Sequence, residues 1–179
     1  MKKVFLILLA IPVLISAQQF KFGFDTEFSY IRITNNKKTQ ALGYESFIPI
    51  TFNLLLGYKV NEDISLKASV GKTILAVEFS GYEIGLGVIY KFYKPFYLSS
   101  GFMYHSNEGG DLSISHGVSF AALYLITAGI GYNFSDSFSL GLNYYFPLKK
   151  EKLIYYYFPP HSYSFYSMLR LNFIFLWSL

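Results

Sequence analysis

Three adjacent polar residues, His105, Ser106 and Asn107, come nearest to a catalytic set in this sequence. A hydrolase with a serine nucleophile needs a base beside the hydroxyl and a group that orients the base. Here the histidine directly precedes the serine, and adjacent side chains of a β-strand point to opposite faces. Only a β-bulge would bring the two together, so the sequence predicts no working catalytic pair at this position.

The same stretch resembles the lipid A deacylase family of outer-membrane barrels, whose motif is His, any residue, Ser and Asn, followed by a glycine-rich loop and an acidic residue. Ser106 and Asn107 match the serine and the asparagine of that motif. The resemblance implies a lipid A-modifying hydrolase with Ser106 as nucleophile, which we keep as an alternative. Two departures weigh against it, because His105 has no residue between it and Ser106, and Ser119 stands where the family places its acid.

The chain offers few ligands for a metal or a cofactor. Its histidines, His105, His116 and His161, are far apart in the sequence and lack the close spacing of a metal site. There is no cysteine, which excludes a thiolate nucleophile and disulfide bonds. We therefore predict no bound metal and no cofactor.

A larger set of titratable side chains shares one face of the expected strands with glycine and serine. If that face is the inside of a narrow barrel, charges of both signs lie in a medium of low dielectric and must be paired or hydrated. Such a luminal polar network either fixes the strand register or lines a gated ion path, and the sequence leaves both open. Its members are Lys21, Asp25, Glu27, Lys67, Glu83, Lys91, His105 and Arg170.

A second basic set is expected near the long connections between strands. Arg32 and Lys72 fall on the opposite, apolar face, but close to the ends of their strands, where a cation can reach lipid phosphates. Together with Lys149 and Lys150 in a loop they would form a basic rim. This rim either binds lipopolysaccharide or is simply solvated.

The elements that must position these residues are strands with two different faces. The composition is 53% hydrophobic and 21% aromatic with only 15% charged residues, which is too little charge for an ordinary water-soluble domain. From Phe20 onward apolar and polar residues alternate with a period of two, which is typical of strands. Eight such segments are expected, at residues 20–30, 48–59, 64–71, 82–92, 96–105, 117–134, 138–148 and 163–179.

The apolar face of these strands carries the bulky side chains, whereas the other face carries glycine, serine and scattered charges. In the last segment we expect Phe165, Leu169, Leu171, Phe173, Phe175 and Trp177 to face outward. A soluble lipocalin-like barrel would place its apolar residues inside, so the pattern favours a barrel that is apolar towards lipid. A sheet in lipid must close on itself, and side chains fill the interior of a barrel of this strand number.

Connections of two lengths alternate along the chain. Tight turns are expected at residues 61–63, 93–95 and 135–137, and longer loops at 35–43, 77–81, 106–116 and 149–161. Outer-membrane barrels have short periplasmic turns and long extracellular loops, so both termini should lie in the periplasm. Aromatic residues next to the short turns predict an interfacial girdle, formed by Phe20, Tyr58, Phe92, Phe96, Tyr132, Phe134, Phe138 and Trp177.

Two segments invite other interpretations. Residues 118–134 carry no charge and could be read as a membrane helix, although they share the two-residue pattern of the other segments. At the start of the chain, Lys2 and Lys3 precede a short apolar run and small residues at Ser16 and Ala17. We predict a signal peptide at residues 1–17 and a mature barrel domain at 18–179. Loss of the two lysines lowers the formal charge from +4 to about +2, which does not suggest nucleic acid.

Through its mature length the chain resembles, by pattern, the small eight-stranded outer-membrane barrels of the OmpA/OmpX type. The resemblance implies an all-β, up-and-down antiparallel barrel in a Gram-negative outer membrane, inserted by the barrel assembly machinery and monomeric. We expect a non-enzymatic protein that contributes to envelope structure or to surface interactions through its long loops. The alternatives are the lipid A-modifying hydrolase and a small gated pore.

Overall fold

The computed structural model describes residues 19–35, 38–41, 49–74, 79–108, 122–150, 152–157 and 160–178. The predicted signal peptide lies outside these residues, as do His116 and Ser119. Within them no helix is long and apolar enough to span a membrane.

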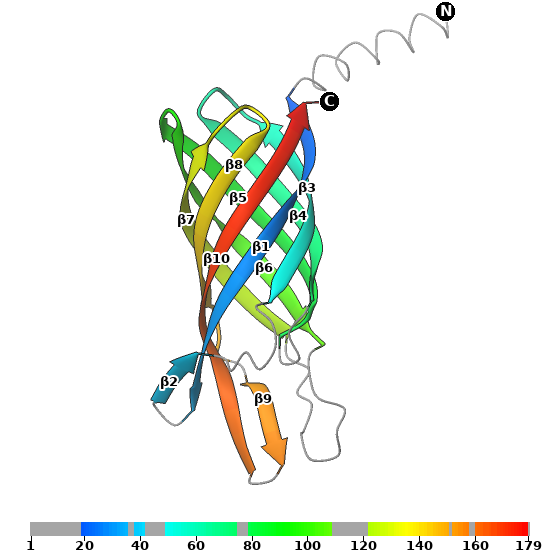
Figure 1. The fold of residues 1–179 in the computed structure, drawn as a ribbon, viewed down its shortest axis with the longest axis vertical. Coiled ribbons are helices and arrows are strands. Elements are labelled where there is room, and N and C mark those ends of the chain that lie inside the picture. Colours follow the sequence, from blue (N-terminus) through cyan, green and yellow to red (C-terminus); the bar gives the residue numbers. More distant parts are fainter. Residues whose placement is uncertain are drawn as a thin grey trace, which may run out of the picture.

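The described chain folds into a closed antiparallel barrel (Figure 1). Each of the barrel strands pairs with the next along the chain, and the first and last strands pair with each other from Lys21 and Ser178 onward. The predicted all-β fold with eight barrel strands is therefore confirmed. These strands are β1 (Phe20–Asn35), β3 (Ile50–Lys59), β4 (Ile64–Ile74), β5 (Gly81–Tyr93), β6 (Phe96–Asn107), β7 (Ala122–Asn133), β8 (Phe138–Pro147) and β10 (Pro160–Ser178).

Two short strands were predicted wrongly as loop. β2 (Lys38–Ala41) pairs with the end of β1, and β9 (Lys152–Tyr157) pairs with the beginning of β10. Both hairpins project from the end of the barrel opposite the start of β1 and the end of β10 (Figure 1). Because β1 and β10 are long, their ends run past the barrel, and the hairpins satisfy backbone groups that would otherwise lack partners.

Short turns gather at the end of the barrel that carries the termini (Figure 1). In the β3–β4 turn, Asn61 Oδ1 accepts hydrogen bonds from the backbone N–H groups of Asp63 and Ile64, at 2.9 and 2.7 Å. Ser135 Oγ does the same for Ser137 and Phe138 in the β7–β8 turn, at 3.2 and 3.0 Å. Side chains that replace backbone partners in this way favour tight turns. The predicted alternation of short and long connections is confirmed where the structure describes it.

The outer surface of the barrel is apolar, with Leu54, Ile84 and Leu86 between 54 and 63% exposed. Rings cover its short-turn end in a connected series of contacts, among them Phe96 with Tyr132 and Phe134 with Phe138. This is the predicted aromatic girdle. β7 belongs to the same wall and alternates like the others, so the helical interpretation of residues 118–134 fails for its described part, 122–134.

One outward assignment was wrong. The pairing of β1 with β10 passes from Arg32↔Ser167 to Ile33↔Phe165, so that Tyr166 is skipped. This bulge reverses the parity of the strand beyond it: Phe165 is 1% exposed and faces the interior, whereas Tyr166 is 47% exposed. Leu169, Leu171 and Trp177, on the other side of the bulge, are exposed as predicted.

Candidate functional site

A buried cluster of charges crosses the interior of the barrel, close to the long-loop ends of β3 to β6. Arg170 on β10 donates from Nη1 to Glu27 Oε2 on β1 at 2.6 Å, and from Nη1 and Nη2 to the two carboxylate oxygens of Glu83 on β5, each at 2.6 Å. His105 on β6 adds a contact of 2.8 Å between its Nδ1 and Glu83 Oε1. None of these side chains is more than 3% exposed. We call these four residues the central charge cluster.

Neighbouring polar groups complete the hydrogen bonding of this cluster. Thr73 Oγ1 donates to Glu83 Oε1 at 2.6 Å, Arg170 Nε donates to Ser29 Oγ at 2.9 Å, and Asn172 donates to Glu27. Buried ions are tolerated only when charge and hydrogen bonds are both matched. The cluster thus ties together four strands, β1, β5, β6 and β10, which are not all neighbours in the wall, and it blocks the lumen where they meet.

Towards the long-loop end the lumen is filled by apolar side chains, which we call the apolar plug. Phe79 connects the plug to the central charge cluster, because its ring lies parallel to that of His105 with centroids 4.0 Å apart. The sequence predicted an interior of small residues and charges, which was incomplete because it did not include this plug. Where both faces of a strand are apolar, the alternation of polar and apolar residues does not show which side chains point inward. The plug consists of Ile31, Ile33, Phe79, Met103, Leu123, Leu125, Tyr145, Leu153, Phe165 and Met168.

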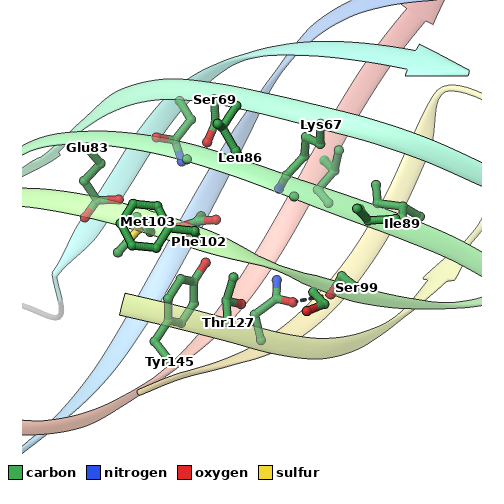
Figure 2. Close-up of a pocket in the computed structure, with 18 of the residues that line it drawn as sticks. Lys67, Ser69, Glu83, Leu86, Ile89, Ser99, Phe102, Met103, Thr127 and Tyr145 are labelled. Carbon is green, nitrogen blue, oxygen red and sulfur yellow. Dashed lines mark hydrogen bonds between the residues drawn. The ribbon is translucent and has the colours of Figure 1, made fainter. Parts of the chain in front are cut away.

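On the other side of the central charge cluster lies a polar chamber of about 50 Å³. Figure 2 shows Lys67, Glu83 and Tyr145 converging on it from β4, β5 and β8, with Ser99 in contact with the amide of Asn143. Next to the chamber, Asn53 donates to Asp25 Oδ1 at 2.7 Å, and Lys67 Nζ lies 3.7 Å from Asp25 Oδ2. A space of this size admits water but no organic substrate.

The lumen then widens into a cavity of about 690 Å³ at the short-turn end. Residues of the β5–β6 and β7–β8 turns and both chain ends of the barrel line it, so its mouth faces the side of the termini. We call it the vestibule. Its lining contains five lysines and a single acidic residue among the described residues: Lys21, Lys59, Lys67, Lys91, Lys94 and Asp136.

The structure divides the predicted luminal polar network into separate groups. Glu27, Glu83, His105 and Arg170 meet in the central charge cluster. Asp25 and Lys67 form a pair next to it, and Lys21 and Lys91 line the vestibule. Sequence reasoning missed Lys59, Lys94 and Asp136 as vestibule residues. The alternation along its strand does place Lys59 on the inner face. The other two lie in turns, where the alternation does not indicate which way a side chain points.

The arrangement of the catalytic candidates argues against a hydrolase. His105 is fully buried inside the barrel and bonded to Glu83, whereas the side chain of Ser106, next along β6, points to the other face of the wall. Asn107 is buried again on the inner side. β6 pairs regularly with both neighbours here, without the bulge that could reunite the pair. In the described part of the chain, no group of three or more His, Cys, Asp or Glu residues could hold a metal.

The predicted basic rim lies on the outside of the barrel near the long-loop end. The guanidinium of Arg32 lies 5.1 Å from the ring centre of Tyr166, and Lys72 Nζ lies 4.5 Å from that of Tyr82. Lys72 also approaches Glu108 at 3.9 Å. Lys149 and Lys150 are exposed after β8.

Solved structures with a similar fold are small outer-membrane barrels. Ail, the attachment invasion locus protein of Yersinia pestis, is 15% identical and covers 89% of this chain and 99% of its own, with a TM-score of 0.50. The N-terminal barrel of Pseudomonas aeruginosa OprF is 20% identical, with coverages of 84 and 97% and a TM-score of 0.44. Neisserial surface protein A is 16% identical, with coverages of 86 and 96% and a TM-score of 0.43. At such identities the likeness to Ail shows the fold alone.

Sequence comparison goes further than fold. No curated protein sequence matches the chain significantly. The model of one protein family, however, matches residues 3–156, which is most of the chain. The chain therefore belongs to the family of type IX secretion system membrane proteins PorP/SprF.

Proposed function

We propose that this protein is an outer-membrane component of a type IX secretion system and serves there as a non-enzymatic scaffold with a sealed lumen. Family membership supports the link to type IX secretion. The apolar outer wall with its aromatic girdle supports a position in the membrane. A scaffold needs a rigid body and surfaces outside the bilayer, and the barrel supplies both.

The blocked lumen is the single observation that favours a scaffold over a channel. The fully buried Arg170, held between Glu27 and Glu83, crosses the lumen. The apolar plug fills the lumen beyond it. An ion crossing here would have to break paired buried charges and then enter an apolar layer, and both steps are unfavourable. Secreted proteins would need far more room than the interior of such a narrow barrel offers.

The proposal places the long-loop end outside the cell and the short turns in the periplasm. Export would depend on the predicted signal peptide, cleaved after Ala17. Fractionation of the envelope and N-terminal sequencing of the mature protein test this placement, and Gln18 is expected as the first residue. A mature protein that keeps Lys2 and Lys3, or that fractionates with the inner membrane, would contradict it.

Two features of the long-loop end suit interactions at the cell surface. The β1–β2 and β9–β10 hairpins project beyond the barrel (Figure 1). The basic rim of Arg32, Lys72, Lys149 and Lys150 lies at the same end, and such cations attract the phosphates of lipopolysaccharide. We infer that the hairpins contact other secretion components, and that the rim helps to hold the barrel at a fixed depth in the outer leaflet.

Deletion of the gene in the source bacterium tests the proposal. Secretion of type IX cargo should fall, and plasmid-borne wild-type protein should restore it. Purified wild-type protein should give no reproducible single-channel steps in planar bilayers. Normal cargo secretion in the deletion strain would refute the assignment to the secretion system. Regular conductance steps would refute the sealed lumen and favour the pore instead.

A further inference from the structure

The vestibule is a blind-ended basic cavity. It is open at the short-turn end, and its inner end is closed by the central charge cluster. Lys67 lines both the vestibule and the polar chamber and so marks the floor. A ligand would enter and leave by the same mouth, which is the geometry of a docking site and not of a conduit.

The charges of the vestibule are poorly balanced within its own lining. Among the described lining residues five lysines face one aspartate, Asp136. The Lys21 ammonium donates to the backbone oxygen of Asp136 at 3.1 Å and lies within electrostatic range of Lys91 and Lys59. Lys67 alone approaches a buried carboxylate, that of Asp25. Like charges held between walls of low dielectric focus the field and attract anions.

We propose that the vestibule binds an acidic peptide segment of a partner protein. The lysines come from β1, β3, β4, β5 and the β5–β6 turn, and they extend from the mouth to the floor. A single anion can meet only a few of them, whereas carboxylates spaced along an extended chain can meet them in succession. Ile89, Ile174 and Leu176 also line the cavity, so apolar side chains between the carboxylates would find contacts there.

A lipid head group fits this site less well than a peptide. Lipids contact the outer face of the wall, and the vestibule lies inside it. To reach the lysines from the membrane, a head group would have to pass over the short-turn edge of the barrel wall while its acyl chains stayed in the bilayer. A peptide from the aqueous compartment meets no such obstacle, and the volume of about 690 Å³ accommodates several residues.

Binding is tested with the purified full-length barrel in neutral detergent. The probe is a peptide of about six residues with alternating Glu and Ser, labelled with an uncharged fluorophore and followed by fluorescence anisotropy. We expect saturable binding that weakens with salt. The Lys21→Gln/Lys91→Gln variant should bind about tenfold more weakly, equivalent to about 1.4 kcal/mol. The control Lys149→Gln/Lys150→Gln makes the same change of charge at the exposed long-loop end and should bind like the wild type.

Competitors identify the class of ligand. A Lys/Ser peptide should not bind, and inorganic phosphate at the same total charge should not displace the Glu/Ser peptide. Equal affinity in both variants, equal binding of the Lys/Ser peptide or displacement by phosphate would overturn the proposal. So would binding that occurs only in nanodiscs with anionic lipid, because the site would then be a lipid site.

Chemical footprinting covers the case in which the double variant fails to fold. Acetylation of wild-type protein with and without the Glu/Ser peptide should show protection of Lys21, Lys59 and Lys91 and none of Lys149. Uniform or absent protection would count against the vestibule.

The direction of its mouth towards the periplasm rests on the proposed function, but binding is measured on the isolated barrel. Failure of the Glu/Ser peptide to bind would therefore not affect the test of the secretion role. Normal secretion in the deletion strain would likewise not affect the binding result.

Discussion

Arg170 and Glu83 form a two-pronged ion pair across the centre of the barrel, with both nitrogen-to-oxygen distances at 2.6 Å. The two residues are 87 positions apart, on β10 and β5, which do not pair with each other in the wall. The planar guanidinium matches the carboxylate in a way that lysine cannot. The pair therefore braces opposite sides of the barrel, and Glu27 joins it from β1, the strand that pairs with β10.

Replacing Arg170 by alanine should destabilise the folded barrel strongly. Glu27 and Glu83 would remain buried without their cation, and removal of one partner from a buried ion pair costs about 3–5 kcal/mol. Equilibrium unfolding in urea, in liposomes or detergent, measures the loss. Lys150→Ala, which removes an exposed cation, should change the free energy of unfolding by less than about 0.5 kcal/mol. Equal stability of the Arg170→Ala protein would mean that the central charge cluster is not what holds these strands together.

The outer wall makes a separate prediction through Leu86, which is 63% exposed in the middle of β5. If this surface lies in the bilayer, Leu86→Arg should cost about 2–4 kcal/mol of folding free energy in liposomes. Tyr93 is 70% exposed at the end of the same strand, where the headgroups would be. Tyr93→Arg should cost less than about 1 kcal/mol. Similar costs at the two positions would be inconsistent with a membrane-spanning orientation of β5.

Alternation of polar and apolar residues was sufficient to predict the barrel wall. It identified all the barrel strands, the short turns and the girdle, because lipid on one side and a crowded lumen on the other impose opposite demands on successive residues. It also placed Glu83, His105 and Arg170 on the inner face. That they meet could not be predicted, since contact across a lumen depends on strand tilt and shear, which no local pattern encodes.

The errors have local physical causes. The reversal at Phe165 follows from a bulge between β1 and β10, and a bulge leaves no mark in a stretch that is aromatic on both faces. β2 and β9 were missed because both are short: β2 lies in a polar segment, and β9 has apolar residues in succession, without the two-residue alternation. The apolar plug was missed for a related reason, since Leu123 and Leu125 alternate with residues that are equally apolar.

The position of Ser106 predicts the result of a direct test for lipid A hydrolysis. Its side chain is separated by the barrel wall from His105, the base that it would need. Purified wild-type protein incubated with lipid A should release no fatty acid above the background of a Ser106→Ala preparation, as measured by mass spectrometry of the lipid. Acyl release that is lost in Ser106→Ala would show that β6 rearranges, and it would restore the hydrolase alternative.

Two glycines near the short-turn end of neighbouring strands make a matched pair. A Cβ added to Gly23 on β1 would lie 1.8 Å from the backbone oxygen of Phe175, whereas one added to Gly57 on β3 would meet nothing closer than 3.4 Å, the Cβ of Lys21. Backbone cannot move aside as a side-chain end can. Gly23→Ala should therefore cost about 1–3 kcal/mol or more through overpacking, and the barrel should fold in lower yield.

Gly57→Ala is the control, since it adds the same methyl group inside the same barrel and has room for it. Its midpoint in urea should stay close to that of the wild type, because the added methyl group would meet only atoms at 3.4 Å or more, the Cβ and backbone oxygen of Lys21 and the backbone oxygen of Leu66. If both alanine variants were equally stable, β1 and β10 would have to be less closely apposed at Gly23 than the structure indicates. Such a result would contradict the pairing of β1 with β10 at Gly23↔Leu176.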